Sequence, residues 1–270
     1  MEQTYLFVPG NRPERFAKAL ASGADRIIVD LEDAVLPADK PQARRAFAEW
    51  HATVDTARVL LRINNAHSAF YADDLELLKA CALPCVMLAK AESPAQISDL
   101  KAIHSGTVLA LIETARGLLA AQAIAASPGV SRLAFGSIDY ALDLDLPSDS
   151  PALDMAAVHL TLASRAADLP APVAGVTVAL DATQVAADMA HAQRLGFAAK
   201  LCIHPSQIPA VRAALAPNAA DLAWAARVLA AYSANPTGAL QLDGKMIDRP
   251  VLLKAQRLLA TPSATPSLTH

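Results

Sequence analysis

The sequence predicts an α/β protein whose core is a closed barrel of eight parallel strands, and three observations predict it. Short apolar runs alternate with Ala-rich helical stretches along most of the 270 residues. The length suits one such barrel, about 250 residues, better than two domains. The chain also lacks the Gly-rich first turn that usually opens a doubly wound sheet. We therefore expect a TIM (β/α)₈ barrel.

Eight apolar runs are expected to form the barrel strands, and helical stretches rich in Ala, Leu, Arg and Gln separate most of them. The expected strands are residues 4–8, 26–30, 58–63, 85–90, 107–112, 132–136, 172–176 and 198–203. The expected helices between them are residues 13–21, 41–50, 73–79, 94–104, 117–126, 154–167 and 181–194.

Further helical stretches follow the eighth strand, at residues 219–231 and 249–259, separated by the turn-rich Asn235-Pro236-Thr237-Gly238. We expect residues 1–234 to form the catalytic barrel domain. Residues 235–270 would add a C-terminal helical arm or lid. The Thr-, Ser- and Pro-rich residues 261–270 would form a disordered tail.

Composition excludes several classes of function. The chain is 54% hydrophobic, but no apolar run approaches the roughly 20 residues of a membrane helix. A net charge of −3 with 4% aromatic residues argues against a nucleic-acid partner. The N-terminus lacks the basic start of an export signal, and three cysteines suit a reducing compartment. We expect a cytoplasmic protein.

Polar residues follow the expected strands, at the end of the barrel where active sites of this fold are built. Glu32 and Asp33 follow the second strand, Arg62 lies near the end of the third, Glu113 follows the fifth and Asp139 the sixth. Carboxylates that converge there repel one another unless a cation neutralises them, and oxygen ligands favour Mg²⁺ or Mn²⁺. Any single acid has an ordinary alternative role as a helix cap or turn residue.

Short motifs follow one another in a fixed order along nearly the whole chain. They are Leu6-Phe7-Val8-Pro9-Gly10 followed by Arg15-Phe16, Asp30-Leu31-Glu32-Asp33-Ala34-Val35, Arg62-Ile63-Asn64, Leu88-Ala89-Lys90, Ile112-Glu113-Thr114-Ala115-Arg116-Gly117, Phe135-Gly136-Ser137-Ile138-Asp139-Tyr140, Cys202-Ile203-His204-Pro205 and Gly244-Lys245-Met246-Ile247-Asp248-Arg249-Pro250. In this order they resemble the citrate lyase β-subunit-like family of CoA-ester lyases, within the HpcH/HpaI aldolase superfamily, which includes malyl-CoA and citramalyl-CoA lyases.

The resemblance implies roles for the acids and the arginine of the rim. Glu113 and Asp139 would bind Mg²⁺, with Mn²⁺ as a possible substitute. Arg62 would stabilise the negative charge that develops on the substrate. Glu32 and Asp33 would hold Arg62 and the metal-bound waters in place.

The resemblance also implies contacts to CoA and a second subunit. Arg12, Arg15 and Lys18 would contact the CoA phosphates, although a solvated basic helix face is an equally good interpretation. Asp248 would reach a neighbouring subunit and exchange a proton with the acetyl-CoA carbon, with capping of the helix that follows as the alternative. We therefore expect a homo-oligomer, a trimer or a hexamer.

The implied reaction is retro-aldol cleavage of a 3-hydroxy-3-carboxyacyl-CoA thioester. We favour (S)-citramalyl-CoA, which yields acetyl-CoA and pyruvate, over malyl-CoA or citryl-CoA. Where the citrate lyase subunit carries an acid before the metal Asp, this chain reads Gly136-Ser137-Ile138-Asp139, which favours the stand-alone CoA-ester lyases. A malyl-CoA thioesterase and a non-catalytic scaffold are the competing classes.

Overall fold

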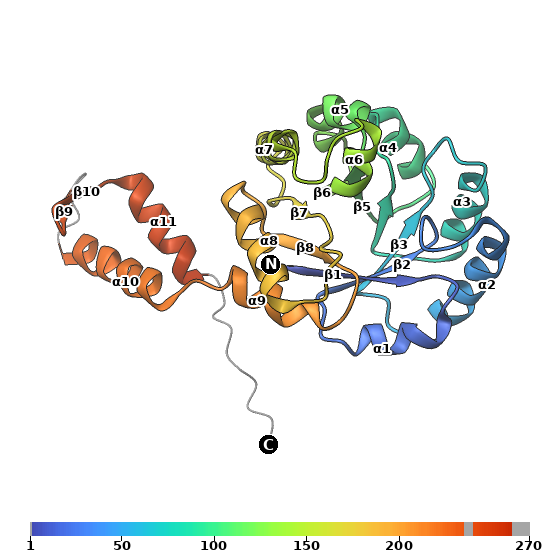
Figure 1. Ribbon diagram of the computed structural model, residues 1–270, viewed down its shortest axis with the longest axis horizontal. Coiled ribbons are helices and arrows are strands. Elements are labelled where there is room, and N and C mark those ends of the chain that lie inside the picture. Colours follow the sequence, from blue (N-terminus) through green and yellow to red (C-terminus); the bar gives the residue numbers. More distant parts are fainter. Residues whose placement is uncertain (1, 235–239, 261–270) are drawn as a thin grey trace, which may run out of the picture. The chain divides into compact units, whose positions relative to one another are not determined.

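The computed structural model describes residues 2–234 and 240–260, and within them eight parallel strands form a closed barrel (Figure 1). Each strand pairs with its neighbours in the sequence, and β8 pairs with β1 to close the ring. This topology confirms the predicted fold class. The strands are β1 (Thr4–Pro9), β2 (Arg26–Asp30), β3 (Val59–Ile63), β4 (Cys85–Leu88), β5 (Thr107–Ile112), β6 (Val130–Phe135), β7 (Val173–Ala174) and β8 (Ala199–Cys202).

Helices follow the strands and surround the barrel (Figure 1). Three of them, η2, α6 and α9, were not predicted, and the helix predicted at 13–21 is a 3₁₀ turn, η1, followed by the short α1. The helices are η1 (Pro13–Arg15), α1 (Phe16–Leu20), η2 (Pro37–Asp39), α2 (Lys40–His51), α3 (Tyr71–Ala80), α4 (Pro94–Lys101), α5 (Ala115–Ala125), α6 (Ser137–Asp143), α7 (Pro151–Ala166), α8 (Ala182–Arg194) and α9 (Gln207–Leu215).

The interior of the barrel is filled by alternate side chains of the strands. Ile28, Leu60, Met87 and Leu109 come from four successive strands and are almost completely buried there. Side chains of this size leave no open channel, so polar chemistry is confined to the ends of the barrel.

Strand β7 is shorter than its apolar run suggests. The expected strand covered residues 172–176, but ladder pairing is limited to Val173 and Ala174. Pro172 has no N–H to donate to a ladder, which limits the strand at its start.

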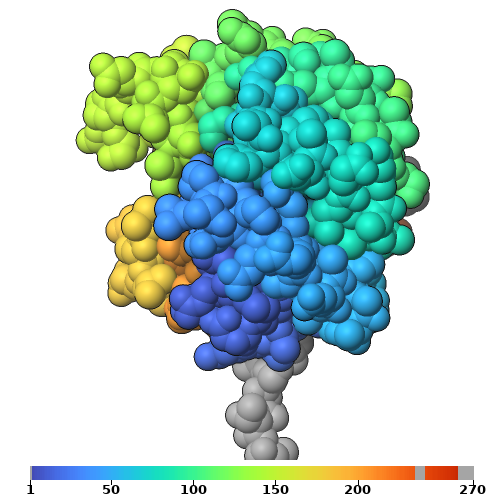
Figure 2. All heavy atoms as spheres, turned by 90° about the vertical axis from the view of Figure 1, so that its right-hand side faces the viewer, coloured from blue at the N-terminus to red at the C-terminus, as the bar shows by residue number. Residues whose placement is uncertain are grey.

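Between α7 and α8, next to β7, lies a cavity of about 560 Å³, and Figure 2 shows this hollow between the yellow-green and gold segments.

The chain divides into one compact unit up to Ala214 and a second from Leu215. The second contains α10 (Ala219–Ala234), an antiparallel pair of strands, β9 (Leu240–Leu242) and β10 (Lys245–Ile247), and α11 (Arg249–Ala260). Asp243 and Gly244 join the two strands with positive φ angles of 51° and 74°, which suits a tight hairpin turn.

The two helices of the second unit share a small core of their own. Ala225 and Val228 of α10 pack with Ile247 and with Ala255 of α11. The predicted boundary between residues 234 and 235 stays a prediction. The predicted turn at 235–238 and the tail at 261–270 lie outside the described residues. No helix in the described part of the chain is long and apolar enough to cross a membrane.

Candidate active site

Arg62 and Asp30 form the most buried ion pair at the C-terminal mouth of the barrel. They are register partners at the ends of the neighbouring strands β2 and β3. The guanidinium Nε and Nη2 of Arg62 donate to the two Asp30 carboxylate oxygens, each at 2.6 Å. Burial alone would raise the pKa of Asp30, but Arg62 outweighs it and holds the pKa below its usual value. This bidentate pair fixes the plane of the guanidinium.

Two more carboxylates from the turn after β2 face the same guanidinium. Arg62 Nη1 lies 3.0 Å from Glu32 Oε2 and 3.8 Å from Asp33 Oδ2. Glu32 is buried, whereas the Asp33 side chain is 55% exposed. Phe7 of β1 lies against the arginine, with the guanidinium carbon 4.8 Å from the ring centroid. Arg62 is therefore held on several sides by strands β1 and β2.

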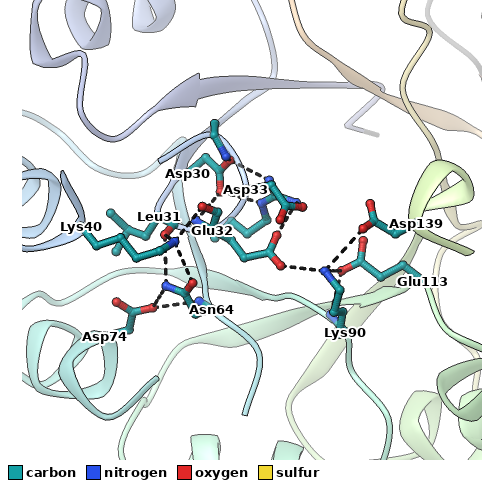
Figure 3. Close-up of polar contacts among 12 residues, drawn as sticks. Asp30, Leu31, Glu32, Asp33, Lys40, Asn64, Asp74, Lys90, Glu113 and Asp139 are labelled. Atoms are coloured by element: carbon teal, nitrogen blue, oxygen red, sulfur yellow. Dashed lines mark hydrogen bonds and ion pairs between the residues drawn. The ribbon is translucent and has the colours of Figure 1, made fainter. Parts of the chain in front are cut away.

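A buried lysine supports this turn from behind. Lys40 Nζ donates to the backbone oxygens of Leu31 and Glu32, at 2.6 and 2.8 Å, and to Asn64 Oδ1 at 2.9 Å. Asn64 in turn donates to Asp74 at 2.7 Å (Figure 3). These bonds satisfy buried polar groups and hold the backbone on which Glu32 is carried.

Glu113 lies directly after β5 at the mouth of the barrel and is almost completely buried. Its side chain is 1% exposed, and its Oε1 accepts a hydrogen bond from the backbone N–H of Lys90 at 2.9 Å. A Cβ on Gly136 would collide with the Glu113 carboxylate, so the close approach of the next strand requires glycine there. Burial, with the nearby Glu32 charge, raises the pKa of Glu113 to about 8. A buried carboxylate of this kind needs a cation to ionise at neutral pH.

Lys90 supplies one positive charge at this place. Its Nζ lies 2.8 Å from Glu32, 3.5 Å from Asp139 and 3.9 Å from Glu113, and Figure 3 shows it between the three acids. Asp139, in the first turn of α6, is 32% exposed and so is open to solvent. Burial alone would lower the pKa of Lys90, but Glu32 and Glu113 raise it above its usual value.

Arg62, Glu113 and Asp139 line one cavity of about 340 Å³, together with the apolar side chains of Phe7, Leu111 and others. Among the described residues no three Cys, His, Asp or Glu side chains are grouped to hold a metal on their own. Glu113 and Asp139 can supply two oxygen ligands to a hard cation, whose other positions would then be open to water or substrate. With such a cation bound, the cavity would suit a small anionic substrate.

A family model for HpcH/HpaI aldolase/citrate lyase matches residues 3–205. The chain belongs to this family. It is 42% identical over 263 residues to a citrate lyase subunit beta-like protein of Mycobacterium tuberculosis, covering 94% of this chain and 93% of the relative. A (3S)-malyl-CoA thioesterase of Cereibacter sphaeroides is 30% identical, over 97% of this chain and 95% of that one. The family membership makes the chain a relative of carbon–carbon lyases of oxo acids.

Solved structures of the family share the fold closely. A crystal structure of the protein CitE from M. tuberculosis in complex with magnesium, acetoacetate and coenzyme A is 39% identical, with a TM-score of 0.88 over 96% of this chain and 97% of that one. A CitE structure from the same organism in complex with magnesium and pyruvate is 34% identical, with a TM-score of 0.79 over 96% and 98% of the two chains.

The basic residues that the family resemblance assigns to CoA lie around η1 and α1. Arg12 and Arg15 are both exposed and flank Glu14, whose Oε1 lies 2.7 Å from Arg12 Nε and 3.9 Å from Arg15 Nε. Lys18 is exposed on α1. The structure therefore gathers the two arginines at the start of the first helix, and their contact to CoA remains a prediction.

Asp248 lies in the second unit, just before α11. Its Oδ1 accepts a hydrogen bond from the backbone N–H of Val251 at 3.2 Å, so it caps that helix. The capping role that the sequence left open as an alternative is thus present. It does not conflict with a catalytic role, which stays a proposal.

Two residues of the mouth, Asp30 and Lys90, were not assigned a role from the sequence. Asp30 is the last residue of a predicted strand, and Arg62 lies near the end of the next, so parallel pairing was the signal that they would meet. Lys90 follows β4 at the same mouth and belongs to a quoted motif. Its left-handed backbone conformation, with a φ of 47°, was indicated by no sequence pattern.

Replacing Asp30 by Asn should destabilise the protein by about 3 to 5 kcal/mol, because Arg62 would stay buried without its bidentate partner. Asp33→Asn is the matched control from the same turn, and its partly exposed ion pair predicts a loss of about 1 kcal/mol or less. Urea unfolding of the three proteins, followed by circular dichroism, measures both changes. Equal stability of the two variants would show that Arg62 does not depend on Asp30.

Proposed function

We propose that the chain is a magnesium-dependent lyase that cleaves (S)-citramalyl-CoA to acetyl-CoA and pyruvate by retro-aldol chemistry. The observation that carries the proposal is that Glu113, Asp139 and Arg62, from three different βα units, line a single cavity at the mouth. The M. tuberculosis structures with magnesium, coenzyme A and pyruvate support the same chemistry for relatives of this chain.

The donor set of the mouth fits magnesium. Glu113 and Asp139 would hold it, because both are hard oxygen donors and the buried Glu113 carboxylate requires positive charge beside it. When bound, the ion supplies Lewis-acid chemistry to the hydroxyl and carboxylate oxygens of the substrate. Glu32 and Asp33 keep Arg62 in place and would orient water at the site.

Arg62 would stabilise the charge that the reaction moves. Cleavage breaks the bond between C2 and C3, counted from the thioester carbon. The hydroxyl oxygen on C3 releases its proton to water, C3 becomes the ketone carbon of pyruvate, and the electron pair of the broken bond passes to C2 to form the thioester enolate. A guanidinium already fixed by Asp30 lines the cavity in which this charge appears. Because it is preorganised, it needs no rearrangement during the reaction.

The enolate must then gain a proton at carbon to become acetyl-CoA. We assign this step to Asp248 of a neighbouring subunit, so that the working enzyme is a homo-oligomer, a trimer or hexamer. Arg12, Arg15 and Lys18 are assigned to the CoA phosphates, which suits their exposed position around η1 and α1. The support for both assignments is the family resemblance of these motifs.

The apolar part of the cavity favours citramalyl-CoA over malyl-CoA. Phe7, Leu111, Val176 and Ile203 line it beside the polar residues, and they can pack against the extra methyl group. One methyl group is worth only about 1 to 3 kcal/mol in such a pocket. The second candidate, malyl-CoA thioesterase, is favoured by the similarity to the Cereibacter sphaeroides enzyme of that name.

Purified protein with Mg²⁺ should release pyruvate from citramalyl-CoA, with a kcat/KM about ten-fold or more above that for malyl-CoA or citryl-CoA. Coupled detection of keto acids and of free CoA measures the products separately. Free CoA together with intact hydroxy acid would identify a thioesterase instead, and no product from any thioester would contradict the lyase proposal.

Glu113→Ala and Asp139→Ala should each lower turnover to about one thousandth or less, because each removes a metal ligand. Isothermal titration should show that Mg²⁺ binding is lost in parallel. Glu76→Ala, an exposed acid on α3, is the control and should change neither quantity. Full turnover in either metal-site variant, or in wild type after thorough chelation, would refute the assignment.

If Asp248 acts in a neighbouring subunit, two inactive variants should complement each other. Co-refolded Glu113→Ala and Asp248→Asn chains should recover about a quarter of wild-type turnover, since random mixing gives that share of intact sites. A mixture of Glu113→Ala and Asp139→Ala should stay inactive, because both defects lie in the same barrel. If the mixture of Glu113→Ala and Asp248→Asn also stays inactive, Asp248 does not act in the active site of a neighbouring subunit.

A further inference from the structure

The position of Lys90 relative to the proposed metal ligands supports a further inference, which rests on the proposed function. Its ammonium lies 3.5 Å from Asp139 Oδ1 and 3.9 Å from Glu113 Oε1, the two carboxylates assigned to magnesium. Among the described residues it is the one cation whose ion pairs reach both of them (Figure 3). Any dication held by the same two acids therefore lies close to a fixed positive charge.

Hydrogen bonds of the backbone fix the position of Lys90 at the mouth. Lys90 has a φ of 47°, a left-handed conformation that costs free energy for a residue other than glycine. Backbone hydrogen bonds fix both neighbours, from Ala89 N–H to Ile63 O and from Ala91 N–H to Leu111 O. The N–H of Lys90 itself donates to Glu113 Oε1. The same residue thus holds Glu113 through its backbone and faces it with its side chain.

The shortest contact of the ammonium is with an acid that is not a proposed metal ligand. Lys90 Nζ lies 2.8 Å from Glu32 Oε1, while its distances to Asp139 and Glu113 are longer than a strong hydrogen bond. Glu32 is in turn held by Arg62 at 3.0 Å. Lys90 is therefore anchored by Glu32 and acts on the metal ligands mainly through its charge.

We propose that Lys90 is a positioning residue that sets the magnesium affinity of the site: its ammonium neutralises Glu113 and Asp139 and competes with the metal for them. Like charges a few ångströms apart repel strongly in a partly buried site. Removing the ammonium should therefore have two effects of opposite sign. The protein without magnesium becomes less stable, and its affinity for magnesium increases.

The test compares wild type with Lys90→Met, which keeps an unbranched side chain, one atom shorter, and removes its charge. Lys79→Met is the matched control, because Lys79 is an exposed lysine that pairs with Glu76 on α3, away from the mouth. Mg²⁺ affinity is measured by isothermal titration on the full chain after EDTA treatment and dialysis. Thermal unfolding is measured in EDTA and again in saturating Mg²⁺.

Lys90→Met should bind Mg²⁺ about ten-fold more tightly than wild type, through the loss of the repulsion. In EDTA its melting temperature should fall by about 2 to 4 °C, and saturating Mg²⁺ should remove that deficit. Lys79→Met should match wild type in both measurements. A purely structural role for Lys90 would instead weaken Mg²⁺ binding together with stability.

Unchanged or weaker Mg²⁺ binding in Lys90→Met, while wild type binds the ion, would overturn this inference and leave the proposed function intact. Failure of Lys90→Met to fold even in saturating Mg²⁺ would also overturn it, because the metal should replace the lost charge. If wild type and the variant both fail to bind Mg²⁺, both this inference and the proposed function are wrong.

Discussion

An excess of negative charge at the mouth of the barrel is the constraint on which the site depends. Among the described residues, the ion pairs of the mouth join five carboxylates to two cations, Arg62 and Lys90. Carboxylates taken out of water repel one another strongly and lose their hydration, so such a cluster persists only with positive charge beside it. Arg62 compensates one side of the cluster and Lys90 the other, and the proposed magnesium would offset most of the negative charge that remains.

The barrel brings these groups together with little freedom. Asp30 and Arg62 meet because neighbouring parallel strands end at the same level. Glycine is required where backbones must pass close to this cluster, since a Cβ on Gly10 would lie 2.7 Å from Asp30 O. Gly136 likewise leaves room for the Glu113 carboxylate. The packed interior beneath the mouth supports the strand ends, so the charged groups are preorganised rather than flexible.

The order of the strands and the acids that follow them could be predicted because apolar runs and the residues just beyond them are local features. The short helix α6, which carries Asp139, could not be predicted, since its seven residues are too few for a periodic pattern. The left-handed conformation of Lys90 could not be predicted from the sequence for another reason. It results from contacts with Glu113 and with neighbouring strands that are distant in the sequence. The Asp30–Arg62 pair could be predicted only in part. The two strand ends were predicted, but the pairing depends on the register of β2 against β3.

The proposed role of the mouth is tested most directly by locating a metal ion in a crystal. Crystals soaked in Mn²⁺, which shares the oxygen ligands of Mg²⁺ and scatters X-rays anomalously, should show one anomalous peak bound by Glu113 and Asp139. Under the same conditions, crystals with no peak at these two carboxylates, or with the ion bound elsewhere, would contradict the account.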